Sequence, residues 1–419
     1  MNPPASDGSM TFQWMTVVDH SFRQLNSGSH AFITETEAHP VRLTPLDRVP
    51  GLLPGTTRLA GRVTGPGLAA EELLWADVPD ELLADVTTRL DAWLLWLLPH
   101  AFETGEDLIL DGPVDAELLR HAHELMEVWS CWRPGKRPVR VMAEAADPSE
   151  RQGTRKGLFF TAGVDSFYSL LHHDEMAHLH PEWKMRPVDD LIYVEGYDIP
   201  LRHRPALDRK RVALQTVAAE TGKTLVTLAT NFRDTGVSLR PKAWGPIVHG
   251  PAVAASGLLL GRRWDTLLLS ASFGYDELNP WGSTAVTDPL CSTSATRLWH
   301  YGADASSDRL RKMECLSRFD VAMNHLHVCW QDFSDRNCGT CEKCFRTLLA
   351  LDLVGARDRA TSFPASLFSP DRLRDVWTEK ELVIRVYRKL RDHAAQVGRS
   401  DVVAVIDECL ARPATANQP

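Results

Sequence analysis

The sequence predicts an α/β protein with a doubly wound, mostly parallel sheet, joined to an N-terminal α+β domain and a helical C-terminal tail. Three observations lead to this fold class. From residue 156 onward, short apolar strands alternate with helices, a pattern typical of parallel pairing through crossover helices. Four cysteines cluster in a short segment before residue 345. Beyond residue 355 the chain becomes a charged, arginine-rich helical segment.

The size and charge of the chain limit which classes of protein it can belong to. A chain of 419 residues is long enough for two or three domains, since single cores usually stop growing near ~250 residues. A net charge of −9 argues against sequence-independent binding of nucleic acid. The longest apolar stretch begins at Leu90, includes Asp91 and Pro99, and is too short to span a membrane. With no signal-peptide pattern at the N-terminus, we expect a cytoplasmic protein without membrane contact.

Residues 1–155 show no chemical motif and are expected to serve substrate selection or dimerisation. They mix strand-like runs with helical segments whose apolar residues recur at three- and four-residue spacing. The strand-like runs are at 11–19, 30–38 and 57–63, and the helical segments at 81–98 and 115–129.

The second part of the chain alternates regularly between strand and helix. Strands are expected at 157–160, 189–198, 223–231 and 264–274, with helices from 167, at 208–222 and at 248–263. Ligands of such sheets bind beyond the carboxyl ends of the strands, so the loops after the strands are the candidate site. A helical tail is expected over 371–398.

The loop TAGVDS, residues 161–166, follows the first of these strands. Gly163 is free to adopt unusual backbone angles, and successive amides at a helix start form an anion cradle. Asp165 suits a magnesium ion. The simpler alternative is an ordinary helix N-terminus, with Asp165 and Ser166 as caps.

This loop resembles the S-G-G-x-D-S motif of the PP-loop ATP pyrophosphatases, which cleave ATP to AMP and pyrophosphate, usually through an adenylated substrate. The residues that match the ATP-binding motif are Thr161, Ala162, Gly163, Val164, Asp165 and Ser166. Thr161 keeps the hydroxyl of the usual serine, whereas Ala162 places a β-carbon where the family has glycine. The resemblance implies ATP and Mg²⁺ as ligands and a sheet of the HUP/PP-loop type.

The cysteine cluster has the spacing C-x8-C-x2-C-x2-C, formed by Cys329, Cys338, Cys341 and Cys344. Four thiolates are the ligand set of a closed, structural zinc site, and the predicted site is of the zinc-knuckle type. A redox C-x2-C pair and an iron–sulfur cluster use the same residue type and stay open as alternatives.

The cysteine spacing is similar to the zinc motif of the 7-cyano-7-deazaguanine synthase family, in which C-x8-C-G-x-C-x2-C lies downstream of the ATP loop. The resemblance covers about residues 156–355. It implies a PP-loop domain at 156–328 and a zinc knuckle with its following helix at 329–355, between the N-terminal domain and a helical extension at 356–419.

The same resemblance points to further site residues. The segment DRLRKMECLS is similar to a later helix start of the superfamily, which makes Lys312 and Arg309 candidates, with Asp165, for catalysis. Positive charge there would stabilise the transition state at the α-phosphorus. His249 lies where the superfamily has an R-N-G helix start, and Asp198 follows the second strand; both are candidates for binding ATP. A solvated basic helix face, a core histidine and a turn cap are the alternatives.

The loop beyond the last predicted strand does not reproduce the synthases' substrate segment, so a different substrate is expected. By position, the candidate substrate-binding residues are Tyr275, Asp276, Ser283 and Asp288. A loop this rich in Gly, Pro, Asn and Asp is also typical of a plain connection.

The sequence therefore predicts an ATP-dependent C–N ligase. A substrate carboxylate, on a small molecule, a peptide or a protein, is adenylated with release of pyrophosphate, and a nitrogen nucleophile then gives an amide or a nitrile. One alternative is sulfur transfer to tRNA or a small molecule, which needs a reactive thiol such as Cys291 or Cys315. Another is a non-catalytic, zinc-containing nucleotide-binding module. A homodimer is left open.

Overall fold

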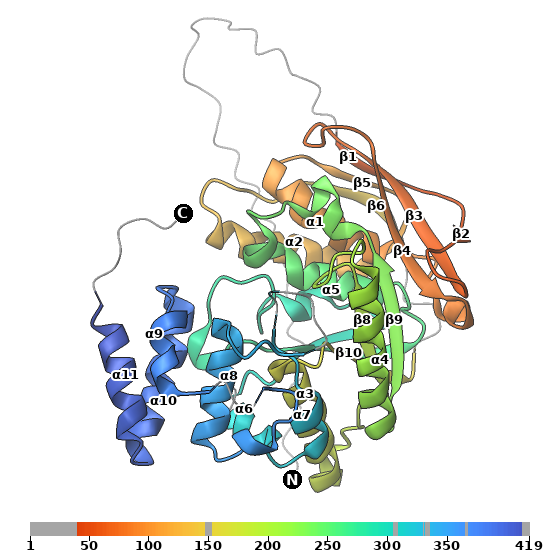
Figure 1. The fold of residues 1–419 in the computed structure, drawn as a ribbon. Coiled ribbons are helices and arrows are strands. Elements are labelled where there is room, and N and C mark those ends of the chain that lie inside the picture. The colour runs from red at the N-terminus through yellow and green to blue at the C-terminus, as the bar shows by residue number, and fades with distance from the viewer. Residues whose placement is uncertain are drawn as a thin grey trace, which may run out of the picture. The chain divides into compact units, whose positions relative to one another are not determined.

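The computed structural model describes residues 40–146, 153–304, 309–329, 331, 336–364 and 368–412. The strand-like runs predicted at 11–19 and 30–38 lie outside these residues. The described part is an α/β structure around one 11-stranded, mostly parallel sheet, as the sequence predicted (Figure 1). None of its helices combines the length and the apolar character needed to cross a bilayer.

The strands run in the spatial order β11-β10-β7-β8-β9-β4-β3-β1-β5-β6, with β2 paired to β3. Their bounds are β1 Val41–Pro45, β2 Val49–Pro50, β3 Thr56–Thr64, β4 Glu72–Pro79, β5 Leu108–Asp115, β6 Val141–Ala146, β7 Arg155–Phe159, β8 Asp190–Glu195, β9 Thr224–Thr230, β10 Trp264–Ser270 and β11 Arg297–Tyr301. The α-helices are α1 Asp91–Thr104, α2 Ala116–Trp132, α3 Val164–Leu179, α4 Arg204–Glu220, α5 His249–Leu258, α6 Arg309–Leu316, α7 Asp320–His325, α8 Glu342–Leu353, α9 Leu373–Val376, α10 Glu381–Gln396 and α11 Ser400–Leu410.

Five neighbouring strands, β9-β8-β7-β10-β11, are all parallel to one another. The chain enters this group at its central strand, β7, moves outward through β8 and β9, and then returns to the other side with β10 and β11. The strand order therefore reverses between β7 and β10. In open α/β sheets such a reversal separates the loops at the carboxyl ends and leaves a crevice for ligands.

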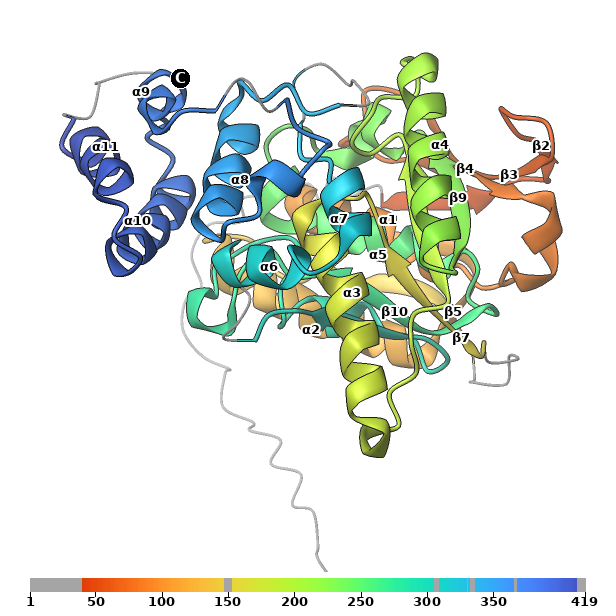
Figure 2. The same cartoon turned by 60° about the horizontal axis from the view of Figure 1, so that its bottom comes forward.

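Helices cover both faces of the sheet, which gives three layers (Figure 2). Successive residues of β8 point to opposite cores: Leu191 and Tyr193 pack under α3 and α4, while Ile192 and Val194 pack against α1 and α5. This two-sided burial explains why the interior of β8, Leu191 to Val194, is apolar on both faces rather than alternating between apolar and polar residues.

The N-terminal strands extend the same sheet, because β4 pairs antiparallel with β9 at Ala76↔Thr230 and Asp77↔Ala229. Asn231 lengthens this joint: its side chain accepts from Trp75 N at 2.8 Å and donates to Leu73 O at 2.7 Å. The boundary predicted at residue 155 is therefore not a break in the sheet. The division into separate domains stays a prediction.

The helix predicted over 81–98 is wrong at its start. Residues Asp80–Asp85 form a 3₁₀ turn, and α1 begins only at Asp91. A buried ion network redirects the chain there: Arg89 binds the carboxylates of Asp91 and Asp115 at 3.0 Å each, and Asp91 also accepts from Asp115 N. Periodicity alone does not reveal such a network, since its residues read as ordinary surface charges.

A second buried carboxylate fixes the amino ends of three central strands. Asp190, at the start of β8, is fully buried and accepts hydrogen bonds from Arg155 of β7 and from Arg263 and Trp264 at the start of β10. Burial alone would raise the pKa of Asp190, but its bonds to Arg155 and Arg263 outweigh burial and lower the pKa. The carboxylate thus ties β7, β8 and β10 into register.

We expect Asp190→Asn to lower the free energy of unfolding by at least ~3 kcal/mol, because Arg155 and Arg263 lose their shared anion. The folded-state pKa is depressed, so this stabilisation is complete above the unfolded pKa of about 3.9 and disappears as the pH falls through the folded pKa. Urea unfolding between pH 7 and pH 2 should show the difference between wild type and variant shrinking below about pH 4.

The control is Asp265→Asn, which removes the exposed Arg186–Asp265 pair and should cost less than ~1 kcal/mol. Equal effects of the two substitutions, or a difference that ignores pH, would contradict the role assigned to Asp190.

Candidate functional site

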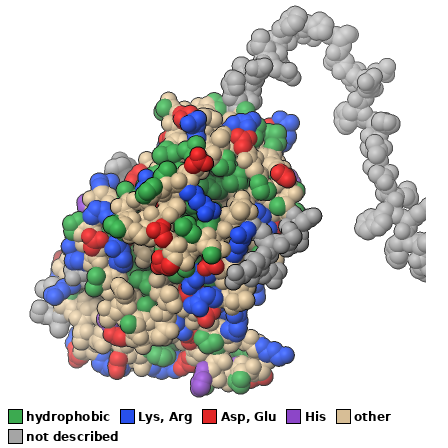
Figure 3. Space-filling model, turned by 90° about the vertical axis from the view of Figure 1, so that its right-hand side faces the viewer, with side chains coloured by type: hydrophobic (Ala, Val, Ile, Leu, Met, Phe, Trp, Pro, Cys, Tyr) green, Lys and Arg blue, Asp and Glu red, His purple; other side chains and the backbone are tan. Residues whose placement is uncertain are grey.

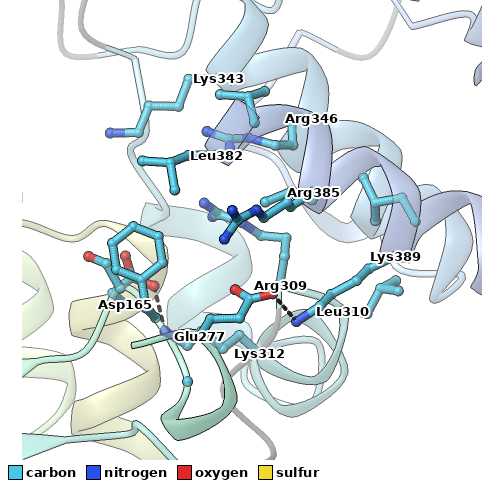
Figure 4. Close-up of a pocket in the computed structure, with 16 residues that line it drawn as sticks. Asp165, Glu277, Arg309, Leu310, Lys312, Lys343, Arg346, Leu382, Arg385 and Lys389 are labelled. Carbon is cyan, nitrogen blue, oxygen red and sulfur yellow. Dashed lines mark hydrogen bonds and ion pairs between the residues drawn. The ribbon is translucent and has the colours of Figure 1, made fainter. Parts of the chain in front are cut away.

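A cavity of about 240 Å³ lies at the carboxyl ends of the parallel strands, beside the reversal between β7 and β10 (Figure 4). It is bounded by the first turn of α3, the loop after β10, and helices α6, α8 and α10. Its lining carries six basic residues but only two acidic ones. The basic residues are Arg309, Lys312, Lys343, Arg346, Arg385 and Lys389, and the acidic ones Asp165 and Glu277.

Two predicted catalytic residues meet at the floor of this cavity. Lys312 Nζ donates to Asp165 Oδ1 at 2.6 Å and to Ala271 O at 2.6 Å, and the lysine side chain is only 2 % exposed. Burial would raise the pKa of Asp165, but the charges of Lys312 and Arg309 hold that pKa below its ordinary value. Asp165 is thus an ionised carboxylate with one oxygen committed to Lys312.

Arg309, the third predicted catalytic residue, lines the cavity from the start of α6. Burial and the neighbouring charge of Arg346 lower the pKa of Arg309 to about 10. Among the described residues, Arg309 has no hydrogen-bond or ion-pair partner. The carboxylates of Asp165 and Glu342 act on its charge without a direct bond, so an anion that enters the cavity would stabilise this half-buried cation further.

The predicted loop 161–166 adopts a conformation different from the expected one. Ala162, not Gly163, has the left-handed backbone, with φ 56°, while Gly163 has an ordinary φ of −76°. The methyl group of Ala162 packs in the core with Phe160 and Phe167, so it does not narrow the loop. Ser166 bonds within the loop, to Gly163 O and Thr161 N. Of the six residues, only Asp165 lines the cavity.

Gly163 nevertheless leaves room for a ligand. A β-carbon at this position would meet only Thr161 Oγ1, at 3.5 Å. The loop is also supported from below, because the buried Lys210 of α4 donates to Thr161 O at 2.7 Å. The amides at this end of β7 are therefore held in place and approachable.

The predicted ATP-binding residues Asp198 and His249 do not line the cavity. Asp198 is exposed after β8. His249 begins α5, where Nδ1 lies 3.1 Å from Trp244 O and the ring packs edge-on against Trp281. Burial lowers the pKa of His249.

Nor do the predicted substrate-binding residues line the cavity. Tyr275 is 56 % exposed and Asp276 lies 3.9 Å from Lys389, next to the lining residue Glu277. Ser283 and the buried Asp288 belong to a packed network: Ser283 Oγ donates to Asp288 Oδ2 at 2.7 Å, and His300 Nδ1 lies 2.6 Å from the same oxygen. This network attaches the loop to β11.

The four cysteines of the predicted metal site come together as expected. The sulfur atoms of Cys329, Cys338, Cys341 and Cys344 all lie within 4.8 Å of one another, and those of Cys338 and Cys344 are 3.8 Å apart. A tetrahedral site with metal–sulfur bonds of ~2.3 Å has sulfur–sulfur separations of roughly 3.8 Å. The set fits one metal ion, whereas an iron–sulfur cluster holds its cysteines further apart.

Backbone amides around the cysteines suit thiolate ligands. The amides of Thr340 and Cys341 donate to Cys338 Sγ at 3.4 and 3.3 Å, and Cys344 N donates to Cys341 Sγ at 3.4 Å. Gly339 has the left-handed φ of 69° that the turn requires. Such N–H···S bonds stabilise negative sulfur and orient the ligands.

The metal site and the cavity share one helix. Cys341 is the N-cap of α8, and Cys344 lies in the first turn. Lys343 and Arg346 of the same two turns line the cavity, so the cysteine cluster fixes the helix end that presents both cations. Sequence reasoning missed these two residues, although their i, i+3 spacing between and after the cysteines already placed them on one helix face.

A second hollow, lined by residues 48–57 and by Asp80 and Leu83, lies over the β2–β3 hairpin. Figure 3 views this side of the molecule, where acidic, basic and hydrophobic side chains are interspersed. The hollow is wide open and its charged lining residues are only Arg48 and Asp80. It therefore lacks the convergent charges that single out the cavity beside Asp165.

We expect Gly163→Ala to leave stability unchanged while weakening the binding of inorganic tripolyphosphate. Its φ is ordinary and the space is open, so the folded state accepts the methyl group. The added carbon would stand between the loop amides and an anion. Thermal unfolding and calorimetric titration measure the two effects.

The control is Gly222→Ala, at a left-handed φ of 67° after α4, which should cost about 1 kcal/mol of stability and leave anion binding intact. Unchanged tripolyphosphate binding in Gly163→Ala would exclude these amides from the site.

The candidate site is thus a basic, partly apolar cavity at the carboxyl ends of a parallel sheet, next to four cysteines arranged for one metal ion. Its cations come from helices far apart in the sequence, at 309–316, 342–353 and 381–396. Comparisons with protein-family models, with curated proteins and with solved structures find no match to this chain.

Proposed function

We propose that the protein binds ATP in this cavity and adenylates a substrate carboxylate with release of pyrophosphate, after which a nitrogen nucleophile displaces AMP. The observation that carries the proposal is the excess of positive charge at the strand-order reversal. Its main element is Arg309, which lines the cavity with Lys312 and makes no hydrogen bond or ion pair to another described residue. A polyphosphate is the biological anion that best matches several converging arginines and lysines.

The arrangement of the parallel strands supports a sheet of the HUP/PP-loop type. The motif-bearing loop follows β7, the first and central strand of the group β9-β8-β7-β10-β11. Beside that loop, Lys312 reaches the floor from α6, the helix start that the resemblance singled out. Each of these placements is what the resemblance implies for an ATP site.

The residues would act mainly by positioning and by charge. The loop 161–166 reaches the cavity through Asp165, and the phosphates would have to extend past this residue to meet the loop amides. Arg309 and Lys312 would neutralise the charge that develops on the α-phosphorus and on departing pyrophosphate. Asp165 keeps Lys312 in place and has a second oxygen available for Mg²⁺. The magnesium ion, when bound, would supply charge neutralisation, held by this carboxylate together with phosphate oxygens.

A structural zinc ion is the metal that the four cysteines fit best. Four thiolates complete a tetrahedron and leave no position for substrate. We assign the ion a supporting role: it fixes the start of α8 and hence Lys343 and Arg346.

Sulfur transfer is less well supported than ligation. Cys291 is 1 % exposed and Cys315 is 8 % exposed, and neither lines the cavity. Burial raises the pKa of Cys291, and burial likewise raises the pKa of Cys315. A sulfur carrier needs an accessible thiolate, which neither residue offers.

The test is release of AMP and pyrophosphate from MgATP, with ammonia and a panel of carboxylates. We expect Asp165→Asn and Lys312→Met each to lower AMP formation by about 100-fold or more. Asparagine is preferred to alanine because it still accepts the hydrogen bond of the buried Lys312. Glu314→Gln, an exposed acid on the same helix α6, should act like the wild type.

Calorimetric titration with ATP separates a missing co-substrate from a wrong proposal. ATP binding that depends on Lys312, without AMP formation, would favour the non-catalytic nucleotide-binding module. If the folded protein binds no ATP, both the proposed ligase and the non-catalytic nucleotide-binding module are refuted.

Metal analysis should find about one zinc ion per chain. We expect Cys341→Ser to lose that ion and to lower the free energy of unfolding by several kcal/mol, since structural zinc contributes on the order of 10 kcal/mol in small domains. Tripolyphosphate binding should weaken as well, because α8 is no longer fixed. Cys131→Ser, at an exposed cysteine, should change none of the three measurements. Normal zinc content in Cys341→Ser would contradict the site.

A further inference from the structure

Helix α10, in the tail beyond residue 355, forms one wall of the cavity. Its residues Leu382, Val383, Arg385, Val386, Lys389 and Leu390 all belong to the lining. An ion pair of 2.8 Å between Lys389 Nζ and Glu277 Oε1 attaches the helix to the loop after β10. The tail thus returns to the same loop region that borders Asp165, although the PP-loop resemblance ends before it.

Two arginines on α10 are alike in their ion pair but differ in whether they line the cavity. Arg385 and Arg388 both bind Glu381 Oε1, at 3.4 and 3.3 Å, and both are substantially exposed, at 41 % and 56 %. Only Arg385 lines the cavity. In Figure 4 its guanidinium reaches into the space that Arg309 and Arg346 also approach, each from a different helix.

The charges of the lining are not balanced from within. Asp165 offsets Lys312, and Glu277 offsets Lys389. Four basic residues of the lining remain: Arg309, Lys343, Arg346 and Arg385. Arg346 and Arg385 form ion pairs with Glu342 and Glu381, at 3.3 and 3.4 Å, but these two acids do not line the cavity. Three arginines from three helices present planar, multiple hydrogen-bond donors, the geometry that suits phosphate oxygens.

We propose that α10 is a functional part of the binding site and that Arg385 binds the same polyphosphate as Arg309 and Arg346. The assignment of that polyphosphate to ATP rests on the function proposed above, whereas the anion contact itself does not. The Lys389–Glu277 pair holds α10 against the loop after β10 and so keeps Arg385 directed at the cavity. The C-terminal tail is then a determinant of affinity.

A purely structural α10 would give a different result. In that case Arg385 would be one more solvated arginine, equivalent to Arg388, and its removal would affect neither affinity nor salt dependence. A contact to a multiply charged ligand instead makes binding sensitive to ionic strength, since salt screens such attraction.

The experiment compares Arg385→Ala with Arg388→Ala in the full-length protein. Calorimetric titration with inorganic tripolyphosphate and with ATP is run at low and at moderate salt, with thermal unfolding of each variant. We expect Arg385→Ala to weaken tripolyphosphate binding about tenfold or more and to reduce its salt dependence. Arg388→Ala should stay within about twofold of the wild type, and Arg385→Lys should retain part of the affinity.

Equal affinities of Arg385→Ala and Arg388→Ala, in folded protein, would overturn the inference. If Arg309→Ala loses ATP binding while Arg385→Ala does not, this inference fails and the proposed ATP site stands. If Arg385→Ala weakens tripolyphosphate binding but the protein neither binds ATP nor forms AMP, the inference stands and the proposed function fails.

Discussion

The buried carboxylate of Asp190 is the constraint on which the central sheet depends. It ties the amino ends of β7, β8 and β10 through Arg155, Arg263 and Trp264. Because a strand of five to seven residues is stiff, fixing the amino ends of these strands also fixes the positions of the segments that follow their carboxyl ends. The first turn of α3, which carries Asp165, and the loop that starts at Ala271 therefore lie close enough for one lysine, Lys312, to bond both residues.

Around that floor, the site is assembled from helices that are distant in sequence. α6, α8 and α10 each deliver an arginine, and each is held by a different device: packing under α3, the cysteine cluster, and the Lys389–Glu277 pair. The cost of gathering like charges is met by burial of apolar surface elsewhere in the fold and by binding of an anion. Affinity and local stability should accordingly be coupled at this site.

The features that could be predicted from the sequence are those that form short-range patterns along the chain. Alternating strands and helices predicted the parallel sheet, and cysteine spacing predicted the four-sulfur site, because both are short-range patterns. Long-range features stayed hidden: the return of α10 to the cavity, the β4–β9 pairing, and the Arg89 network that delays α1. The left-handed backbone of Ala162 was also missed, since glycine at 163 was the natural candidate for it.

The pairing of β4 with β9 affects the order in which the sheet can form. Strand β9 has β8 on one side and β4 on the other, and β4 is made some 150 residues before β9. A fragment without the N-terminal strands would leave β9 as an open edge, a surface prone to pairing with other chains. The N-terminal strands thus protect the edge of β9 from pairing with other chains. During synthesis, β4 can pair with β9 only after β9 has been made.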